Sequence, residues 1–323
     1  MLIISEELAR RLVSVEDAID AVVRTFAAMA RGEARNYPVV REVVGHQNAV
    51  FGVKTGADVS APFLGLKAGG YWPNNMAKGL TNHQSATLLF DPETGRASAL
   101  VSANYLTGLR TGAASAIATK YLSRPDAETL GIIGTGGQSV YQLRATLAVR
   151  PIRRVLAWDP SPANLERFGE TVRELGLDYA PQGERQSVAA GADVLITVTP
   201  SQQALVEKDW VRPGTHISAM GADTKGKQEL DPTLVAAASI FVDEAAQAVT
   251  IGECQHAYAA GLIGDDDVRA SLGGVIAGMV EGRRSAEEIT LFDGTGVALQ
   301  DLVVAHLALQ RAGEQGAGTT VDY

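Results

Sequence analysis

The residues best suited to bind a cofactor form a glycine-rich turn, Gly-Thr-Gly-Gly-Gln-Ser, at positions 134–139. This G-x-G-x-x-S pattern follows an apolar run over 130–133 and precedes a segment with helical character. Gly134 permits a tight turn, Gly136 lets the backbone approach a pyrophosphate, and Ser139 is small enough for close packing of a helix on a strand. The turn therefore predicts a dinucleotide site, and the alternative is a tight turn with a purely structural role.

Asp159 supports a dinucleotide and indicates which one. It ends the next apolar run, where an acidic residue commonly binds the ribose hydroxyls. Its carboxylate would repel the 2′-phosphate of NADP, and no Arg or Lys lies between Asp159 and Arg167 to neutralise that phosphate. We therefore expect NAD (NADH) rather than NADP, and the alternative is an ordinary acid at the end of a strand.

Asp223 is the candidate for proton chemistry. It lies just beyond the apolar run 215–219, in the glycine-containing segment 220–227. Ligands of open α/β sheets bind beyond the carboxyl ends of the strands. A carboxylate there can exchange a proton with a carbon–nitrogen centre while a hydride moves. The alternative is a solvated turn residue, because Asp is common in turns.

Four basic side chains stand in apolar or aromatic surroundings: Arg41, Lys54, Lys67 and Arg110. Burying a charged side chain is costly unless a partner compensates it. Together they predict a site for an anionic ligand, because Arg binds carboxylates through two parallel hydrogen bonds. Taken singly, each also fits a charged residue on an edge strand or a lysine that buries only its stem.

Other reactive side chains carry weaker signals. His83 fits a proton donor or acceptor, and it also fits a hydrogen-bonded structural histidine. Cys254 lacks neighbours that would activate a thiol, so we expect it to pack in the interior. The sequence contains no G-x-S-x-G elbow, H-E-x-x-H pair or P-loop lysine, which are the signatures of triad hydrolases, zincins and P-loop NTPases.

Composition excludes several classes of protein. A chain of 323 residues with 46% hydrophobic residues and a formal net charge of −9 is typical of a folded, acidic protein. The acidic balance argues against nucleic acids and anionic membranes as partners. No apolar run reaches the ~18 residues of a membrane span, and the N-terminus lacks a secretory signal pattern. One cysteine excludes an internal disulfide and a Cys-based zinc site, so we expect a cytoplasmic protein without a metal.

The elements that must position these residues change in character along the chain. Ser14 and Asp17 form a capping-box pattern before a helix that stops at Gly32. Short apolar runs over 35–101 predict a mostly antiparallel sheet, and 104–122 predicts a helix. Further along, strands are expected at 130–134, 155–158, 194–198, 215–219 and 240–242, and helices at 138–148, 163–175 and 297–307.

This alternation predicts an α/β protein of two domains. Residues 1–120, joined by the C-terminal helix 296–312, are expected to form an α+β substrate-binding domain around the antiparallel sheet. Residues 121–295 are expected to form a doubly wound parallel sheet of the Rossmann type that binds NAD. Residues 313–323 are rich in Gly and Thr and are expected to be a flexible tail.

The chain resembles the ornithine cyclodeaminase/mu-crystallin family over nearly its whole length. The most specific stretches are 64–75, 78–80, 88–95 and 105–115, and the glycine turn, 221–223 and 293–301 also match. The resemblance implies a homodimer formed through the N-terminal domain, which would then serve dimerisation as well as substrate binding. It also implies that the C-terminal helix packs back on that domain.

The resemblance also implies roles for individual residues. Lys67 matches a catalytic lysine that contacts the substrate, Arg110 a carboxylate-binding arginine, and Asp223 the catalytic acid or base. Arg41 matches a further substrate-binding arginine, and Thr295 falls at the lip of the substrate pocket. The positions implied to contact the cofactor are Asn82 (where a threonine is usual), Arg110, Thr111, Gly134, Gly136, Gly137, Gln138, Ser139, Asp159, Thr199, Met220 and Lys227.

Family resemblance does not name the substrate, because such families house several chemistries. Lys54 stands where the family commonly has a Met-Pro pair, and the four cations exceed the need of one α-carboxylate. At ~4 Å and an effective dielectric near 20, an extra lysine would repel the terminal ammonium of ornithine by about 4 kcal/mol. We therefore expect an NADH-dependent imine reductase acting on a dicarboxylic imine, such as iminosuccinate giving aspartate, with Lys54 as a substrate-binding residue.

Three alternatives remain open from the sequence. The first is ornithine cyclodeaminase, which would convert ornithine to proline and ammonia with catalytic NAD. The second is another amino-acid dehydrogenase or ketimine reductase, such as alanine dehydrogenase. The third, and least expected, is a non-catalytic binding protein of the crystallin type.

Overall fold

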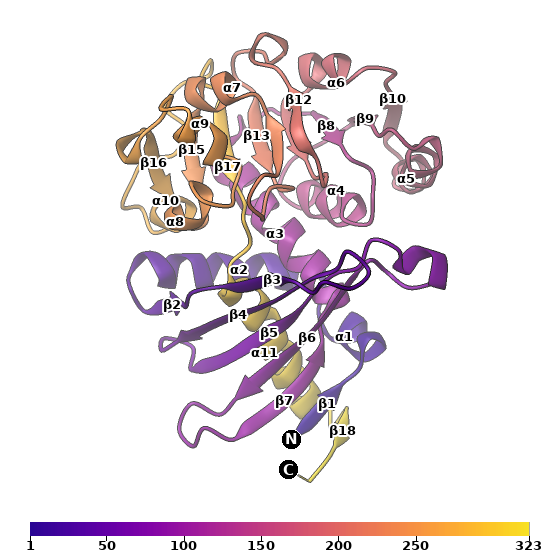
Figure 1. The fold of residues 1–323 in the computed structure, drawn as a ribbon, viewed down its shortest axis with the longest axis vertical. Coiled ribbons are helices and arrows are strands. Elements are labelled where there is room, and N and C mark those ends of the chain that lie inside the picture. Colours follow the sequence, from indigo (N-terminus) through magenta and orange to yellow (C-terminus); the bar gives the residue numbers. More distant parts are fainter. Residues whose placement is uncertain (323) are drawn as a thin grey trace. The chain divides into compact units, whose positions relative to one another are not determined.

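The structure, a computed structural model, describes residues 1–322 and divides into two compact units (Figure 1). The first unit combines Met1–Arg110 with the segment from Val297 onward, and the second unit is Thr111–Gly296. The chain therefore leaves the first unit and returns to it with its last helix. α3 (Asn104–Leu122) spans the boundary, so Arg110 and Thr111 are adjacent on one helix but belong to different units.

An eight-stranded sheet builds the first unit, and all of its neighbouring strands are antiparallel except the pair β1–β7. This arrangement confirms the predicted, mostly antiparallel sheet. A short 3-10 turn, η1 (Asn75–Lys78), lies between β5 and β6. The spatial order is β18 (Thr319–Thr320), β1 (Leu2–Ile4), β7 (Ala97–Ser102), β6 (His83–Phe90), β5 (Phe63–Tyr71), β4 (Val50–Asp58) and β2 (Ala34–Asn36), and β3 (Val40–Val43) also pairs with β4.

The last helix, α11 (Ala298–Glu314), packs on one face of this sheet. Glycines on β4 and β5 allow the close approach. A Cβ added to Gly56 would lie 3.3 Å from the side chain of Leu299, and one added to Gly65 would lie 3.2 Å from that of Leu302. The helix therefore lies against the face of the sheet that carries Gly56 and Gly65.

Two N-terminal helices complete the first unit, α1 (Glu6–Leu12) and α2 (Val15–Ala30). The predicted capping box is present, because Ser14 and Asp17 exchange hydrogen bonds between side chain and backbone. Asp17 also forms an ion pair with Arg311 of α11, and this contact lowers the pKa of Asp17 despite its partial burial. The two ends of the chain are thereby joined in one unit.

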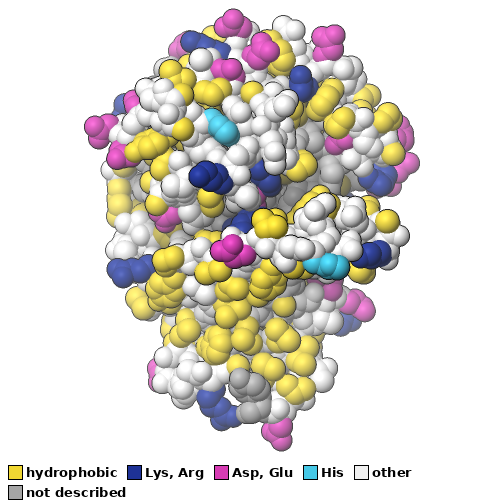
Figure 2. Space-filling view, viewed as in Figure 1, with side chains coloured by type: hydrophobic (Ala, Val, Ile, Leu, Met, Phe, Trp, Pro, Cys, Tyr) yellow, Lys and Arg dark blue, Asp and Glu magenta, His cyan; other side chains and the backbone are white. Residues whose placement is uncertain are grey.

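The sheet face opposite α11 keeps apolar side chains partly exposed. Residues alternate between the two faces along each strand, so the side chains next to the buried ones point away from the helix. Figure 2 shows hydrophobic side chains gathered over these strands. The larger ones of intermediate burial on this face of β5, β6 and β7 are Leu64, Leu66, Leu88, Phe90 and Leu100.

The stretch 313–323, expected to be a flexible tail, contains regular structure among the residues that the structure describes. α11 continues to Glu314, and β18 pairs in antiparallel fashion with β1. The backbone amide of Val321 also donates to the carbonyl of Met1 at 2.9 Å. The segment supplies an outer strand of the sheet, and Tyr323 lies outside the described residues.

The second unit is built on a parallel sheet of eight strands, which confirms the predicted doubly wound α/β fold. The strand order reverses between β8 and β11, and such switch points are where ligands bind in this architecture. A separate parallel pair joins β12 (Gln202–Val206) and β14 (Gln228–Leu230). The order of the main sheet is β10 (Asp178–Pro181), β9 (Arg154–Trp158), β8 (Thr129–Ile133), β11 (Val194–Thr197), β13 (His216–Ala219), β17 (Thr290–Asp293), β15 (Ser239–Val242) and β16 (Val268–Ser271).

Short helices connect these strands. Among the described residues, no helix combines the length and the apolar composition needed to cross a membrane. The helices are α4 (Ser139–Leu147), α5 (Pro162–Glu174), α6 (Arg185–Gly191), α7 (Pro232–Ala237), α8 (Ala245–Ala248), α9 (Gln255–Ala259) and α10 (Leu272–Ile276), with 3-10 turns η2 (Lys208–Trp210) and η3 (Asp265–Asp267).

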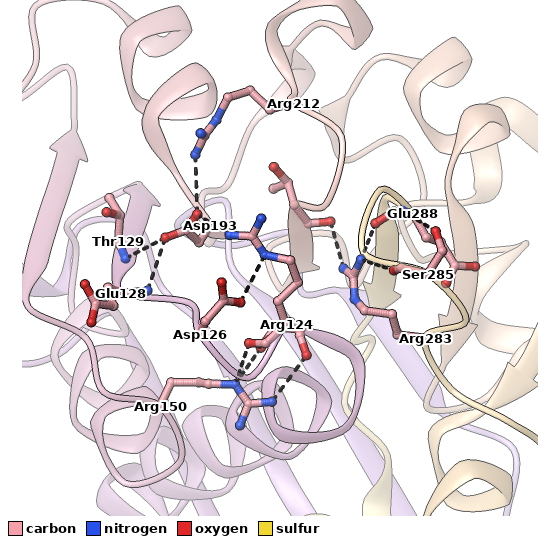
Figure 3. A network of polar contacts seen from close by, with 12 residues as sticks. Arg124, Asp126, Glu128, Thr129, Arg150, Asp193, Arg212, Arg283, Ser285 and Glu288 are labelled. Atoms are coloured by element: carbon pink, nitrogen blue, oxygen red, sulfur yellow. Dashed lines mark hydrogen bonds and ion pairs between the residues drawn. The ribbon is translucent and has the colours of Figure 1, made fainter.

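A polar network lies at the amino-terminal ends of the strands of the second unit (Figure 3). Arg150 and Arg283 each donate at 2.7 Å to carbonyl oxygens at the end of α3, those of Lys120 and Leu122 respectively. These bonds satisfy carbonyls that a helix leaves without an internal partner. Asp193 accepts hydrogen bonds of 2.9–3.4 Å from Arg124, Arg212 and the backbone amides of Glu128 and Thr129.

We expect Asp193→Ala to destabilise the protein by about 2–3 kcal/mol, because two backbone amides and two arginines lose an acceptor. The midpoint of urea unfolding, followed by tryptophan fluorescence, measures this change. Asp178→Ala is the matched control, because that carboxylate is 65% exposed and meets Arg154 at 3.3 Å. We expect the control to change stability by less than about 0.5 kcal/mol, and equal effects of the two variants would contradict the role of Asp193.

Candidate active site

The glycine turn follows β8 and leads into α4. Gly134 has a φ of 98°, and a Cβ there would lie 2.7 Å from Cγ2 of Thr199 and 2.8 Å from the carbonyl oxygen of Val198. Conformation and space therefore both exclude a side chain at this position. Apart from its immediate chain neighbours, a Cβ on Gly136 or Gly137 would meet no atom of the described residues within 4 Å, so a ligand can approach the backbone closely there.

The start of α4 presents polar groups beside this turn. The hydroxyl of Ser139 donates to the carbonyl oxygen of Gly136 at 2.7 Å and closes the turn onto the helix. Gln138 is the N-cap residue, and its Oε1 is buried without a hydrogen-bond partner among residues 1–322. The first amides of a helix favour anions. The turn and the helix start therefore fit the pyrophosphate of a dinucleotide.

Asp159 lies directly against the glycine turn. Its Oδ2 accepts a hydrogen bond of 2.7 Å from the backbone amide of Thr135. Its Oδ1 accepts from the backbone amide of Ser161 at 2.8 Å and from Nδ2 of Asn164 at 3.2 Å. The carboxylate is thereby held at the end of β9, in the position that favours a ribose with free hydroxyls over one with a 2′-phosphate.

Glu229 joins the loops that follow β11 and β13, and sequence reasoning missed it. The side chain is fully buried. It accepts hydrogen bonds from the hydroxyl of Thr197 at 2.7 Å and from the backbone amides of Thr199 at 2.6 Å and Gly221 at 2.9 Å. A Cβ on Gly221 would lie 2.5 Å from this carboxylate, so glycine is required. Its position in a short Gln-Glu-Leu run gives no signal that a sequence pattern could detect.

Asp223 forms an ion pair with Lys227. The Lys227 ammonium lies 2.7 Å from Oδ1 of Asp223 and 3.2 Å from the carbonyl oxygen of Gly221. Gln255 fastens the same loop, because its Oε1 accepts the backbone amide of Gly226 at 2.8 Å. The structure therefore brings together two residues predicted to act separately, a catalytic acid or base and a cofactor contact.

Further buried acidic side chains lie near these loops. Glu253 accepts the backbone amides of Glu229 at 2.9 Å and Leu230 at 2.6 Å. Burial raises the pKa of Glu229, of Glu253 and of Asp293, the last to about 7. The hydroxyl of Thr295, expected at the substrate pocket, donates to Oδ1 of Asp243 at 2.7 Å and is buried within the second unit.

Three of the four predicted cations of the first unit lie on the same sheet face as Gly56 and Gly65. Lys54 on β4 pairs in register with Lys67 on β5, so their side chains are direct neighbours. Arg41 on β3 pairs with Gly52, which lies two residues before Lys54 on the same face. Like charges directly opposite each other across strands are destabilising. We call Arg41, Lys54, Lys67 and Arg110 the cation cluster.

One carboxylate connects the cluster to α3 and α11. Oδ1 of Asp301 lies 3.1 Å from the ammonium of Lys67 and 2.9 Å from Nε of Arg110. Oε1 of Gln300 accepts a second bond from Arg110 at 3.0 Å. Lys67 and Arg110 are each 7% exposed and Asp301 is 2% exposed, so this is a buried ion-pair network with two cations and one anion.

This network perturbs proton affinities. Burial, together with the positive charges of Arg110 and Lys54, lowers the pKa of Lys67 to about 7, although the negative charge of Asp301 opposes this shift. Burial alone would raise the pKa of Asp301, but Arg110, Lys67 and Lys54 bring it down to about 2. Lys67 can therefore gain or release a proton near neutral pH, while Asp301 stays ionised.

The remaining predicted residues have other surroundings. His83 pairs in register with Tyr71 on the sheet face of Lys67. Asn82 donates to the hydroxyl of Tyr71 at 3.2 Å and belongs to the first unit. Thr111 is buried on α3, and Met220 follows β13, where its sulfur would lie 2.6 Å from a Cβ on Gly294.

The two units therefore carry different groups that a reaction could use. The second unit fits a dinucleotide at a glycine turn and carries a carboxylate–ammonium pair at the end of β13. The first unit concentrates positive charge around a lysine with near-neutral pKa. Chemically, the groups of the second unit can host a hydride donor and exchange protons, and those of the first unit can bind an anion.

The chain is similar to several characterised proteins. It is 52% identical over 322 residues to the iminosuccinate reductase of Paracoccus denitrificans, with 100% of both chains covered. The crystal structure of that enzyme in complex with NAD+ matches with a TM-score of 0.94, covering 100% of this chain and 99% of that one. An alanine dehydrogenase from Archaeoglobus fulgidus is 39% identical, with 100% of this chain and 98% of that protein covered.

A third similar protein is a reductase of a different name. The Delta(1)-pyrroline-2-carboxylate reductase of Thermococcus litoralis, solved with NADH and L-proline, matches with a TM-score of 0.96 at 32% identity, covering 99% of this chain and 100% of that one. The model of the ornithine cyclodeaminase/mu-crystallin family matches residues 2–316. The chain therefore belongs to the ornithine cyclodeaminase/mu-crystallin family.

Proposed function

We propose that this chain is an NAD-dependent reductase of a small dicarboxylic imine, with iminosuccinate giving aspartate as the reaction that fits best. The observation that carries the proposal is the neighbouring pair of Lys54 and Lys67, placed beside the buried Arg110–Asp301 contact. This arrangement leaves more positive charge than one α-carboxylate neutralises. The likeness to the iminosuccinate reductase of Paracoccus denitrificans supports the same reaction.

The residues proposed to hold the cofactor include the glycine turn. NADH, when bound, supplies the hydride that the imine carbon accepts. Asp159 favours NADH over NADPH, because its carboxylate would repel a 2′-phosphate. We further infer a cytoplasmic location, because a reaction that consumes NADH depends on a compartment that regenerates it. The proposed cofactor contacts are Asn82, Arg110, Thr111, Gly134, Gly136, Gly137, Gln138, Ser139, Asp159, Thr199, Met220 and Lys227.

The cation cluster is proposed to bind the two carboxylates. Arg110 and Arg41 bind one carboxylate, and Lys54 binds the second. Thr295 is the further substrate-binding residue that the family resemblance implies. Holding the substrate in one orientation lowers the activation barrier of the reduction, because the reacting groups no longer have to find that orientation by chance. Lys67 stabilises charge near the reacting carbon and exchanges a proton near neutral pH. Reduction of the C=N bond also requires one proton on nitrogen, which we assign to Asp223.

We infer a homodimer formed through the sheet face opposite α11, where Leu64, Leu66 and Leu88 remain only half-buried. A structure of an archaeal alanine dehydrogenase that matches this chain with a TM-score of 0.95 is described as a dimer, which supports the inference. Sedimentation equilibrium tests it: a dimer is expected, and Leu88→Asp should yield monomers because it places charge in the interface.

The reaction itself is tested by NADH absorbance with oxaloacetate plus ammonia as the source of imine. We expect fast oxidation and aspartate as the product, and little oxidation with pyruvate plus ammonia or pyruvate plus methylamine. Proline formation from ornithine with only catalytic NAD+ would instead identify a cyclodeaminase, which consumes no net cofactor. Preference for pyruvate would indicate an alanine-dehydrogenase activity, and no turnover on any substrate would favour a binding protein.

Lys54→Ala tests the second carboxylate site. We expect the KM for oxaloacetate plus ammonia to rise about tenfold or more, because a charge-assisted contact is lost. The slow reaction with pyruvate plus ammonia should not change. Lys208→Ala, which removes an exposed lysine of the second unit, is the control. Unchanged kinetics of Lys54→Ala with the dicarboxylic substrate would refute the assignment.

Asp223→Ala tests the proton-transfer assignment. We expect kcat to fall by about 10²-fold or more, as is typical when a general acid or base is removed. NADH affinity, measured by fluorescence titration, should stay within a few-fold of wild type. If turnover and cofactor affinity fall together, Asp223 instead holds the loop that it shares with Lys227.

A further inference from the structure

We propose that Asp301 is a positioning residue of the substrate site: by sharing one carboxylate oxygen between Lys67 and Arg110, it orients both cations and sets the positive charge offered to the substrate. The inference rests on the proposed function. It gives a role to Asp301, for which neither the sequence patterns nor the proposed reaction had one. Asp301 lies in the stretch 293–301, in which the family resemblance implies a role for Thr295 but none for Asp301.

The geometry ties three separate elements to one atom. Oδ1 of Asp301 on α11 lies 3.1 Å from Nζ of Lys67 on β5 and 2.9 Å from Nε of Arg110 on α3. Gln300, the preceding residue on α11, accepts from Arg110 at 3.0 Å. Two consecutive residues of α11 therefore fix the plane of the guanidinium, and one of them also fixes the ammonium.

The start of α11 is built to hold this carboxylate. Asp301 lies in the first turn of the helix, where the helix dipole favours a negative charge. The backbone amide of Leu299 donates to Oδ1 of Asn36 at 3.0 Å, which anchors the same turn to β2. Leu299 and Leu302 pack against Gly56 and Gly65. These contacts hold Asp301 over β5, the strand on which Lys67 comes two residues after Gly65.

Charges from every side act on Lys67. Asp301 faces it from α11, Arg110 from α3 and Lys54 from β4. The neighbour on β6 is Thr87, which does not titrate near neutral pH. Asp301 is the one anion in this set, and it favours the protonated ammonium that a carboxylate substrate requires. Removing its charge should therefore make Lys67 lose its proton at lower pH.

The proposal predicts a shifted pH profile for Asp301→Asn. In the wild type, kcat/KM should fall as the pH rises through about 7, where Lys67 loses its proton. In the variant, this fall should occur about one pH unit lower or more, because an opposite charge close to the ammonium is removed. Glu314→Gln, an exposed charge change on the same helix, should leave the profile unchanged. A uniform loss of activity with an unshifted profile would show that Asp301 has only a structural role.

Asp301→Glu keeps the proposal testable if the asparagine variant does not fold. The longer side chain retains the charge but displaces the carboxylate, so the pH profile should stay in place while the KM for the dicarboxylic substrate rises about tenfold. A shifted profile with an unchanged KM would overturn the proposal. If the wild type reduces no imine from oxaloacetate, the proposed function fails, and the pH dependence of succinate binding by calorimetry then tests Asp301 separately.

Discussion

The carboxylate of Asp301 compensates two buried cations, Lys67 and Arg110, that reach it from other parts of the chain. Lys67 precedes Asp301 by 234 positions and Arg110 precedes it by 191. Removing one partner of a buried ion pair typically costs about 3–5 kcal/mol, because the remaining charge stays buried. The first unit therefore depends on the return of the chain end, and the ion pair of Arg311 with Asp17 joins the two ends a second time.

The second unit meets a different constraint, which is the close packing of loops at the carboxyl ends of its strands. Gly134 and Gly221 have no room for a side chain, in the second case because the carboxylate of Glu229 occupies that space. Glu229 in turn accepts backbone amides from the loops after β11 and β13. The position of Asp223 therefore depends on a buried acid that cannot itself reach solvent.

Local patterns in the sequence predicted the elements well. The helix over 104–122 coincides with α3, and the Ser14–Asp17 capping box is present, because both depend on residues close in sequence. The glycine turn was also predictable, because the strand before it and the helix after it are its direct neighbours in sequence. The cations were found from their apolar surroundings, which local sequence also shows.

Contacts between distant segments were beyond sequence reasoning. The register that makes Lys54 and Lys67 neighbours depends on the turn between β4 and β5. The role of Asp301 requires α11 to pack on β5, and the burial of Glu229 requires β14 to join two loops. The pairing of β18 with β1 likewise depends on where α11 ends, so local sequence does not show this strand.

The central claim is that the cation cluster binds two carboxylates. Calorimetry with the NAD+-saturated protein, comparing succinate with butyrate, tests it most directly, because the two ligands have the same carbon chain and differ in one carboxylate. We predict that succinate binds at least about tenfold more tightly, a difference of about 1.4 kcal/mol. Equal affinities would contradict the account, because the second carboxylate would then meet no cation.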